Sequence, residues 1–454
     1  MSYMSVAARG IRTLLGAGDY RRVFALALPA VGEQLLNMTV GLVDTFMVGH
    51  IGANAVAAVG LSNQAVMIVT TFFAAVATGV TALVARHTGA HEPEDANQVL
   101  HQGYLVGAVM GIVGTALSVA FAEPMMHLLR APADVVAPGT TYLRIAALPF
   151  ILTSWLFIGN AALRGAGDTR SPMMVMFFVN IVNIAVAYAF IYGVGPLPAM
   201  GVAGSAMGAA AGRGVGGLLV LALLLRGRAG LRLKLADLLP DMVQMKRIAN
   251  IGIPAGAEQL LMRFGMTAYV TTVAALGTKA YAAHQLALQS ESIAYMPGFG
   301  FAIAATTMVG QGLGARRPDQ ARADGYLARR MAILFMSAMG VIFFVFAAAI
   351  LGLFIDDPEV IQLGIWPLRL VAFSQPALAT SMVLSGGLRG AGDTRATMVI
   401  TSIGLWLVRL PLAVLLTGPL GLLGAWIAMG IDLQVRGGAM FLRFRSGKWA
   451  KLKV

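Results

Sequence analysis

Long uninterrupted apolar runs are the feature that most limits what this chain can fold into. The stretch AILFMSAMGVIFFVFAAAILGLF, residues 332–354, exceeds the roughly 20 residues with which a helix crosses a bilayer. Apolar residues make up 58% of the chain and charged residues 12%, proportions that exclude an ordinary soluble protein. The chain is therefore predicted to be an all-α integral membrane protein.

The apolar runs are separated by charged or Gly/Pro-rich gaps, and the gaps predict the topology. Twelve transmembrane helices are expected, starting near residues 23, 55, 99, 140, 172, 201, 250, 281, 326, 362, 397 and 421. Alternate gaps and the two tails hold 26 of the 33 Lys and Arg residues, so the positive-inside rule predicts a multi-pass protein with both termini in the cytoplasm. Because these basic residues lie between spans and not among stacking aromatics, the net charge of +13 does not indicate nucleic-acid binding.

The octapeptide LRGAGDTR occurs twice, at 163–170 and 388–395, an offset of 225 residues. The same offset aligns much of the preceding sequence, and beyond the octapeptide an offset of 220 aligns GVAGS with GLLGA. The chain is thus predicted to form two homologous six-helix lobes of the same topology around a central cavity. The expected parts are a cytoplasmic tail (1–22), an N-lobe (23–226), a basic linker (227–247), a C-lobe (248–442) and a second basic tail (443–454).

The octapeptide itself is predicted to be structural. Its glycines can end a helix and turn the chain, and its arginines suit the cytoplasmic side. Because both halves carry it, we interpret Arg164, Asp168, Arg389 and Asp393 as parts of a repeated inner corner and not as substrate ligands. Two facing lobes suit rocking between inward and outward openings, so a transporter is the leading functional class.

Several motifs resemble those of the multidrug and toxic compound extrusion (MATE) family, within the MOP flippase superfamily. They are the paired LRGAGDTR, PAVGEQLLNMTVGLVDTFMVGHIGANAVAAVG in span 1, NIAVAYAFIYGVG in span 5, GIPAGAEQLL in span 7 and AYAAHQLALQ in span 8. The resemblance implies an antiporter in a prokaryotic cytoplasmic (inner) membrane. Such a protein contributes to drug resistance by expelling organic, often cationic and amphiphilic, compounds in exchange for protons or sodium ions.

Asp44 is the strongest candidate for the coupling carboxylate. An embedded acid is expensive in a bilayer and so marks a functional site by default. Glu33 and Asp44 lie eleven residues apart on one helical face, and the second half keeps the glutamate as Glu258 but replaces the aspartate with Tyr269. The resemblance agrees, because prokaryotic members bind the coupling cation at the aspartate of a VDT segment in span 1. The alternative is that Asp44 only hydrogen-bonds neighbouring helices.

Asn180 and Asn183 in span 5 are candidate partners of Asp44, because amide oxygens can ligate a cation. Interhelical amide bonds are the alternative role. Family members often carry an acid or amide four residues after Asn183, where this chain has Ala187. That departure weakens a possible sodium site at Asp44, the one metal site that the sequence suggests, and favours protons as the coupling ion there.

Other embedded polar residues are candidates for the substrate cavity. Glu33 and Glu258 each follow a proline that frees a backbone carbonyl, so they could also order equivalent regions of the two lobes. His284 could relay protons or could simply be a satisfied interhelical bond. The full set of expected cavity residues is Glu33, Gln34, Asn37, Glu258, Gln259, His284, Gln285 and Gln289.

The sequence excludes several other classes of function. There is no cysteine, no phosphate-binding GxxxxGK[ST] motif and no metal-spaced cluster, so no cofactor and no enzymatic activity are expected, and an ion gradient must drive transport. Small organic molecules and the lipid bilayer are the expected partners of a monomer. The alternative function is a lipid-linked oligosaccharide flippase of the same superfamily, which would be expected to show a cationic cavity.

Overall fold

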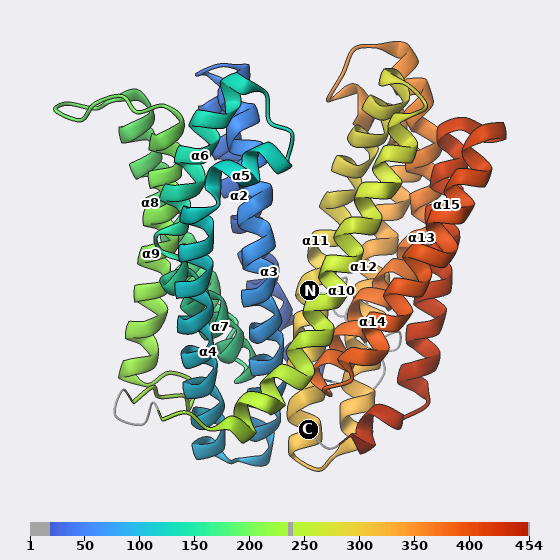
Figure 1. Ribbon diagram of the computed structural model, residues 1–454. Coiled ribbons are helices and arrows are strands. Elements are labelled where there is room, and N and C mark those ends of the chain that lie inside the picture. Colours follow the sequence, from blue (N-terminus) through green and yellow to red (C-terminus); the bar gives the residue numbers. More distant parts are fainter. Residues whose placement is uncertain (1–18, 235–238, 453–454) are drawn as a thin grey trace, which may run out of the picture. The chain divides into compact units, whose positions relative to one another are not determined.

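The computed structural model describes residues 19–234 and 239–452, and the regular structure of these residues is helical (Figure 1). Within these ranges the only β pairing is an isolated bridge between Arg228 and Leu231. The prediction of an all-α fold is therefore confirmed. The first half of the chain contains α2 (Tyr20–Gly49), α3 (Ala53–Ala90), α4 (Pro93–Ala120), α5 (Ala122–Leu128), α6 (Ala133–Ala147), α7 (Phe150–Gly165), α8 (Arg170–Tyr192) and α9 (Val202–Arg226).

The second half repeats this order with longer helices. It contains α10 (Met242–Ala274), α11 (Thr278–Gly314), α12 (Pro318–Gly352), α13 (Pro358–Gly390), α14 (Thr394–Ser402), the π-helix η2 (Ile403–Arg409), α15 (Leu410–Arg445) and the short η3 (Lys448–Lys451). Two breaks explain why the helices do not correspond one to one with the expected spans. α6 and α7 meet at a bend of 56° next to Pro149, and Gly421 interrupts α15 with a positive φ of 57°.

By length and hydropathy, eight of the described helices could cross a membrane, or nine if α6 and α7 form one bent span. The run from Thr394 to Arg445 counts once in that number, although Gly421 divides it at the expected start of span 12. α10 and α13 have 33 residues each, enough to cross a membrane, but neither contains a stretch that is both long enough and sufficiently apolar and uncharged to count as a membrane span. All twelve expected spans thus correspond to helical segments, two of them unusually polar.

The helices form two compact units. The N-unit is Gly32–Gly256, and the C-unit combines Met1–Val31 with Ala257–Val454, each within the described ranges. Large buried side chains fill both interiors: Phe73 and Tyr142 in the N-unit, and Phe343 and Trp426 in the C-unit. The expected lobes began at residues 23 and 248, so each unit instead takes in the first part of the other half's first helix.

Glycines at equivalent places allow these first segments to pack closely. In the C-unit, a Cβ on Gly300 of α11 would lie 2.8 Å from the carbonyl oxygen of Ala27 on α2. In the N-unit, a Cβ on Gly252 of α10 would lie 2.6 Å from the carbonyl oxygen of Ala75 on α3. Residues 27 and 252 are 225 apart, as are 75 and 300, so the repeat is preserved in these contacts. Small residues are what allow helix backbones to approach in a membrane protein.

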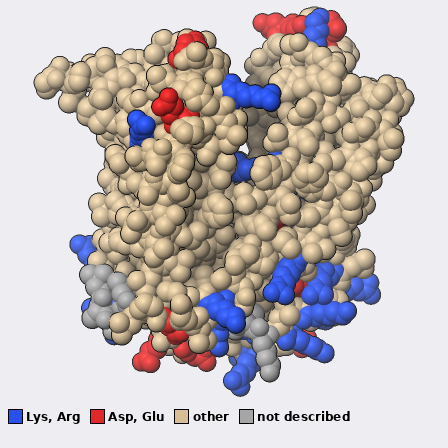
Figure 2. All heavy atoms as spheres, viewed as in Figure 1, with Lys and Arg blue, Asp and Glu red and all other residues tan. Residues whose placement is uncertain are grey.

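Basic side chains concentrate at one end of the C-unit helices. Figure 2 shows this cluster at the end where the chain's C-terminal residues lie, while acidic side chains gather at the opposite end of the same unit. A separation of this kind along the helix direction is what the positive-inside rule produces in a membrane-spanning bundle.

We expect alanine at Gly252 or Gly300 to destabilise the protein by roughly 1–3 kcal/mol, because the new methyl group would force two helix backbones apart. Thermal unfolding of purified protein in detergent measures this. Gly438→Ala is the control: no atom lies within 4 Å of its added Cβ, and alanine is the better helix former. Unchanged melting of both Gly252→Ala and Gly300→Ala would contradict the close packing.

Candidate functional site

Asp44 lies on α2 in the N-unit and is buried. The groups that act on its carboxylate are Arg213 of α9 and Asn183 of α8. Tyr142 of α6 is buried beside them, influenced by the charges of both Asp44 and Arg213. Its hydroxyl donates to Asn63 Oδ1 at 3.2 Å. Four helices therefore converge on one embedded acid.

This group of side chains leaves several polar atoms unsatisfied. Within the described ranges, Oδ1 of Asp44, Oδ1 of Asn183, Oγ of Ser205 and NH1 of Arg213 are buried and have no hydrogen-bond partner. Buried polar atoms are nearly always satisfied in folded proteins, and exceptions need a reason such as a bound water or ion, or a role in function. A bound proton or cation would satisfy the oxygens of Asp44 and Asn183, and a bound water could also accept from Arg213. We call Asp44, Asn183, Ser205 and Arg213 the N-unit polar cluster.

The two expected asparagine partners differ in their surroundings. Asn183 lies next to Asp44, whereas the side-chain nitrogen of Asn180 donates to the carbonyl oxygen of Met176 in its own helix at 2.7 Å. Ala187, which stands where the family often has an acid or amide, is fully buried. Sequence reasoning missed Arg213; an arginine in the middle of a glycine- and alanine-rich span was the available signal.

In the N-unit the octapeptide connects the first helix to the segment that follows the last one. Arg164 donates to Glu33 on α2 at 2.8 Å. Asp168, in the turn between α7 and α8, accepts hydrogen bonds from Ser171 and from Arg228, which lies just beyond α9. Burial opposes the ionisation of Asp168, but the hydrogen bonds from Ser171 and Arg228 outweigh it and hold the pKa of Asp168 below its usual value.

The C-unit repeats the arrangement with one difference. Arg389 donates to Glu258 on α10 at 2.8 Å, and Arg443 near the end of α15 donates to Asp393 at 2.8 Å. Glu258 also accepts from the hydroxyls of Thr397 and Thr401, so both its oxygens are bonded. In contrast, Oε2 of Glu33 is buried without a partner among the described residues. The octapeptide thus connects equivalent segments of each unit in the same way, as the repeated corner that the sequence suggested. We call these contacts of its arginine with the glutamate and of its aspartate with a second arginine the octapeptide brace.

A cavity of about 380 Å³ lies within the C-unit. Its volume falls in the range of small-molecule pockets. Four methionines and two aromatic residues supply much of its apolar wall: Met262, Met266, Met382, Met429, Tyr295 and Phe299. Five charged residues also line it: Glu258, Glu291, Arg389, Arg409 and Arg436.

Asp432 organises the arginines of this cavity. The fully buried carboxylate accepts from Arg409 at 2.8 Å and from Arg436 at 2.7 Å, both through Oδ2. Sequence reasoning assigned no role to Asp432 or Arg436. The available signal was an acid and a base one helical turn apart inside an apolar span, where isolated charges are rare.

The eight expected cavity residues are not gathered at this cavity, which Glu258 alone of them lines. Gln285 and Gln289 are exposed, and Nε2 of Gln285 donates to the hydroxyl of Tyr281. His284 is fully buried between Tyr269 and Trp426, with both ring nitrogens lacking hydrogen bonds among the described residues. Asn37 donates to the carbonyl oxygen of Glu33 and to Oε1 of Gln34, while Gln259 is half-buried beside Glu258 in sequence.

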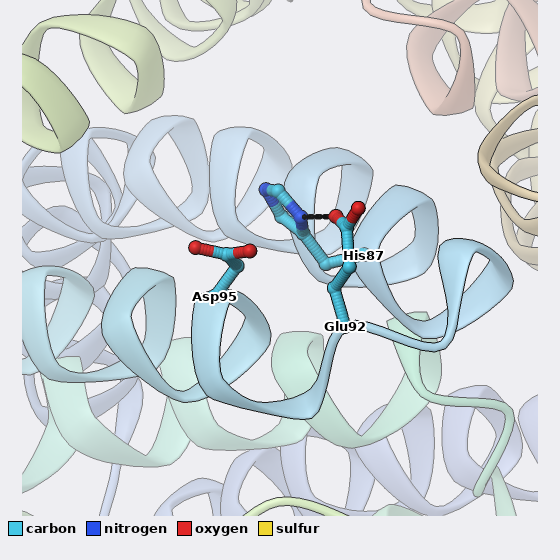
Figure 3. A group of neighbouring side chains, drawn as sticks. All are labelled: His87, Glu92 and Asp95. Atoms are coloured by element: carbon cyan, nitrogen blue, oxygen red, sulfur yellow. Dashed lines mark hydrogen bonds and ion pairs between the residues drawn. The ribbon is translucent and has the colours of Figure 1, made fainter.

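His87, Glu92 and Asp95 form a small cluster at the turn between α3 and α4 (Figure 3). His87 Nδ1 lies 2.9 Å from Glu92 Oε2, and the ligand atoms of all three lie within 4.8 Å of one another, close enough for a metal ion. The histidine is in the last turn of α3 and the two acids are at the start of α4. Those are the positions at which charges complement the helix dipoles, so favourable helix-dipole interactions explain the cluster without an ion.

Comparisons with known proteins agree with the repeat. The MatE family model matches residues 29–189 and again residues 254–415, so the two matches begin 225 residues apart. The chain is 32% identical over 438 residues to the "Probable multidrug resistance protein NorM" of Thermotoga maritima, covering 96% of this chain and 94% of that protein. It is 29% identical to the "Multidrug resistance protein MdtK" of Yersinia pestis, covering 94% and 95%. A crystal structure described as "MATE in the bent conformation" matches with a TM-score of 0.88 at 23% identity over 96% and 97% of the two chains.

We expect Arg389→Gln to be more destabilising than Glu258→Gln. Removing the arginine leaves a buried carboxylate without its counter-charge, at a cost of about 3 kcal/mol. The glutamine at 258 is neutral, and its amide can accept from one threonine hydroxyl through its oxygen and donate to the other through its nitrogen. Thermal unfolding of the two variants and of the double variant measures this. The double variant should recover part of the loss; if Arg389→Gln melts like the unchanged protein, the brace is not structural.

Asp168 predicts a dependence of stability on pH. Because its pKa is lowered in the folded state, its ionised form stabilises the fold above the ordinary aspartate pKa of about 4, and that contribution is lost as the pH falls. The melting temperature of Asp168→Asn should therefore lie below that of the unchanged protein at neutral pH and approach it in acid. A difference that stays constant from pH 7 to pH 3 would contradict this role.

Proposed function

The chain belongs to the MatE family of membrane transporters, and on that premise we propose that it is a secondary active multidrug efflux antiporter with Asp44 as its coupling carboxylate. It expels organic, cationic amphiphilic compounds in exchange for protons by alternating access. The observation that carries this proposal is the N-unit polar cluster, an embedded acid surrounded by unsatisfied polar atoms that the second half does not copy. The names of its relatives support multidrug efflux as the task.

Protons are favoured over sodium by the chemistry around Asp44. A sodium ion is a hard cation that is held by several oxygen ligands at once. Asp44 is the single carboxylate of the cluster, Ala187 offers no ligand, and the guanidinium of Arg213 acts on the same carboxylate as a fixed positive charge. A proton needs only one carboxylate, and Arg213 can balance Asp44 after the proton has left.

The coupling cycle follows from the cost of an embedded charge. With Asp44 protonated, the cluster carries the positive charge of Arg213 and repels a cationic compound. With Asp44 ionised, the carboxylate and Arg213 compensate each other, so a cationic compound is no longer repelled. A bound proton on Asp44 therefore disfavours a bound organic cation, and an organic cation disfavours the proton. This mutual exclusion is what exchange of the two requires.

The flippase alternative requires a surplus of positive charge in the binding cavity. The C-unit cavity has three arginines, more than the sequence suggested, but acids offset them. Arg389 pairs with Glu258, Arg409 and Arg436 share Asp432, and Glu291 is a further acid of the wall. The balance of three bases and three acids favours the antiporter.

We further propose that the protein works as a monomer in a prokaryotic cytoplasmic membrane, with both termini in the cytoplasm and without a cofactor. The distribution of basic residues supports this orientation.

The test is efflux of a cationic dye from proteoliposomes under an imposed pH gradient or an imposed sodium gradient. We expect the pH gradient to drive efflux and the sodium gradient not to, and Asp44→Asn to lower the gradient-driven rate at least about tenfold because it holds no exchangeable proton. Glu123→Gln, which changes an exposed acid of the same unit, is the matched control. Full activity of Asp44→Asn, or no transport by the unchanged protein under either gradient, would overturn the proposal.

A further inference from the structure

One arginine of the C-unit has no acidic partner and lies outside the cavity. Arg369 on α13 is partly exposed and forms no ion pair among the described residues. Its Nε donates to the carbonyl oxygen of Phe344 on α12 at 3.2 Å, and its other two nitrogens make no hydrogen bond within residues 239–452. An uncompensated charge is expensive in a membrane-spanning segment. The guanidinium therefore has a positive charge and free donors to offer to a ligand.

Aromatic rings hold this guanidinium in place. It lies over the ring of Trp366, 5.2 Å from the centroid, and over the ring of Phe344, 5.6 Å from the centroid. Phe373 packs edge-on against Phe344, with 5.7 Å between the ring centroids. A guanidinium stacked on ring faces keeps its N–H groups free in its own plane. We call Phe344, Trp366 and Phe373 the aromatic frame.

A close approach of two helices brings the frame together. A Cβ on Gly340 of α12 would lie 3.1 Å from the carbonyl oxygen of Ala372 on α13. Phe344 follows Gly340 by one turn, and Arg369 precedes Ala372 by one turn. Because α12 and α13 are joined by a short connection and pack against each other in opposite directions, these two steps lead to the same place. The site is therefore fixed by rigid helices and not by a loop.

The frame lies toward the end of the C-unit that is opposite the basic cluster. Arg369 is about 16 Å along the axis of α13 from its first residue, and helical side chains lean toward the helix N-terminus. Its contact with Trp366, one turn nearer that end, agrees with this direction. Tryptophan is typical of the level of the lipid head groups, and all three rings of the frame are exposed. Lipid is what surrounds exposed rings at this depth.

The N-unit keeps the arginine but not the frame. At the offset of 225 residues, Arg144 on α6 corresponds to Arg369. The positions of the three rings are occupied there by smaller side chains, Val119, Thr141 and Leu148. The arginine is thus common to both repeats, whereas the rings that hold it are particular to the C-unit. The frame is not needed to build the six-helix fold, and Arg144 provides a matched control.

We propose that Arg369 and the aromatic frame form a binding site for an anionic phospholipid. The guanidinium holds the lipid phosphate, which matches its planar donors, and the rings contact the glycerol and the first carbons of the acyl chains. The lipid belongs to the leaflet at the end of the C-unit opposite the basic cluster. This inference goes beyond the proposed efflux function and does not depend on it.

Trp366 serves as the reporter of the bound lipid. The full-length protein is reconstituted into phosphatidylcholine bilayers with increasing fractions of phosphatidylglycerol that has brominated acyl chains, which quench tryptophan on contact. Subtracting the fluorescence of Trp366→Phe isolates this residue among the five tryptophans of the chain. We expect phosphatidylglycerol to be enriched about fivefold over phosphatidylcholine at Trp366, the effect of one basic residue near a lipid head group.

Three variants test the parts of the site. Arg369→Gln should abolish the enrichment, because no charge remains to hold the phosphate. Phe344→Leu keeps the backbone carbonyl and an apolar side chain but removes one ring, so it should lower the enrichment. Arg144→Gln removes the same charge from the equivalent place in the N-unit and should leave the enrichment at Trp366 unchanged.

Equal quenching of Trp366 by brominated phosphatidylglycerol and brominated phosphatidylcholine in the unchanged protein would overturn the proposal. An equal loss in Arg369→Gln and Arg144→Gln would also overturn it, because the enrichment would then come from the overall charge of the protein. Inorganic phosphate at constant ionic strength should not relieve the enrichment; relief would assign the site to free phosphate. If Arg369→Gln does not fold, an undiminished enrichment in Phe344→Leu rules the site out.

Discussion

An ionised side chain inside a bilayer must be paired, and the buried glutamate–arginine pair of each unit meets this requirement. Glu33 with Arg164 and Glu258 with Arg389 tie the first helix of each repeat to the end of its fourth span. The aspartate of the same octapeptide then holds an arginine that follows or ends the sixth span. Eight residues therefore fasten three separate parts of each unit, which explains why each half carries its own copy.

The differences between the repeats carry the functional argument. Both units contain the glutamate–arginine pair. The N-unit has the acid Asp44 where the C-unit has Tyr269, and only the C-unit has the charges of Glu291, Asp432 and Arg436. The brace itself is also unequal, since Glu258 has two threonine donors that Glu33 lacks. A duplicated scaffold can therefore hold different buried charges in its two interiors while keeping the same fold.

Much of the fold followed from the sequence because bilayer crossing depends on local composition. The spans, the octapeptide corner and the position of Asp44 beside Asn183 needed only periodicity, hydropathy and the repeat offset. The surroundings of the expected cavity residues did not follow from the sequence: Gln285 and Gln289 are exposed, and His284 is enclosed by aromatic rings. Periodicity shows which residues share a helical face, but not what that face meets.

The sequence by itself determined the class of fold, the duplication and the acid that one half does not share, because these depend on composition and spacing along a single chain. Only the tertiary structure decided which charges are partners. Asp432 satisfies two arginines: Arg436, one turn along the same helix, and Arg409, at the end of a π-helix 23 residues earlier in the chain. It also decided that α2 and α10 each begin in the unit of the other half. Both outcomes arise from packing between distant segments, where backbone approach at a few glycines sets which side chains can meet.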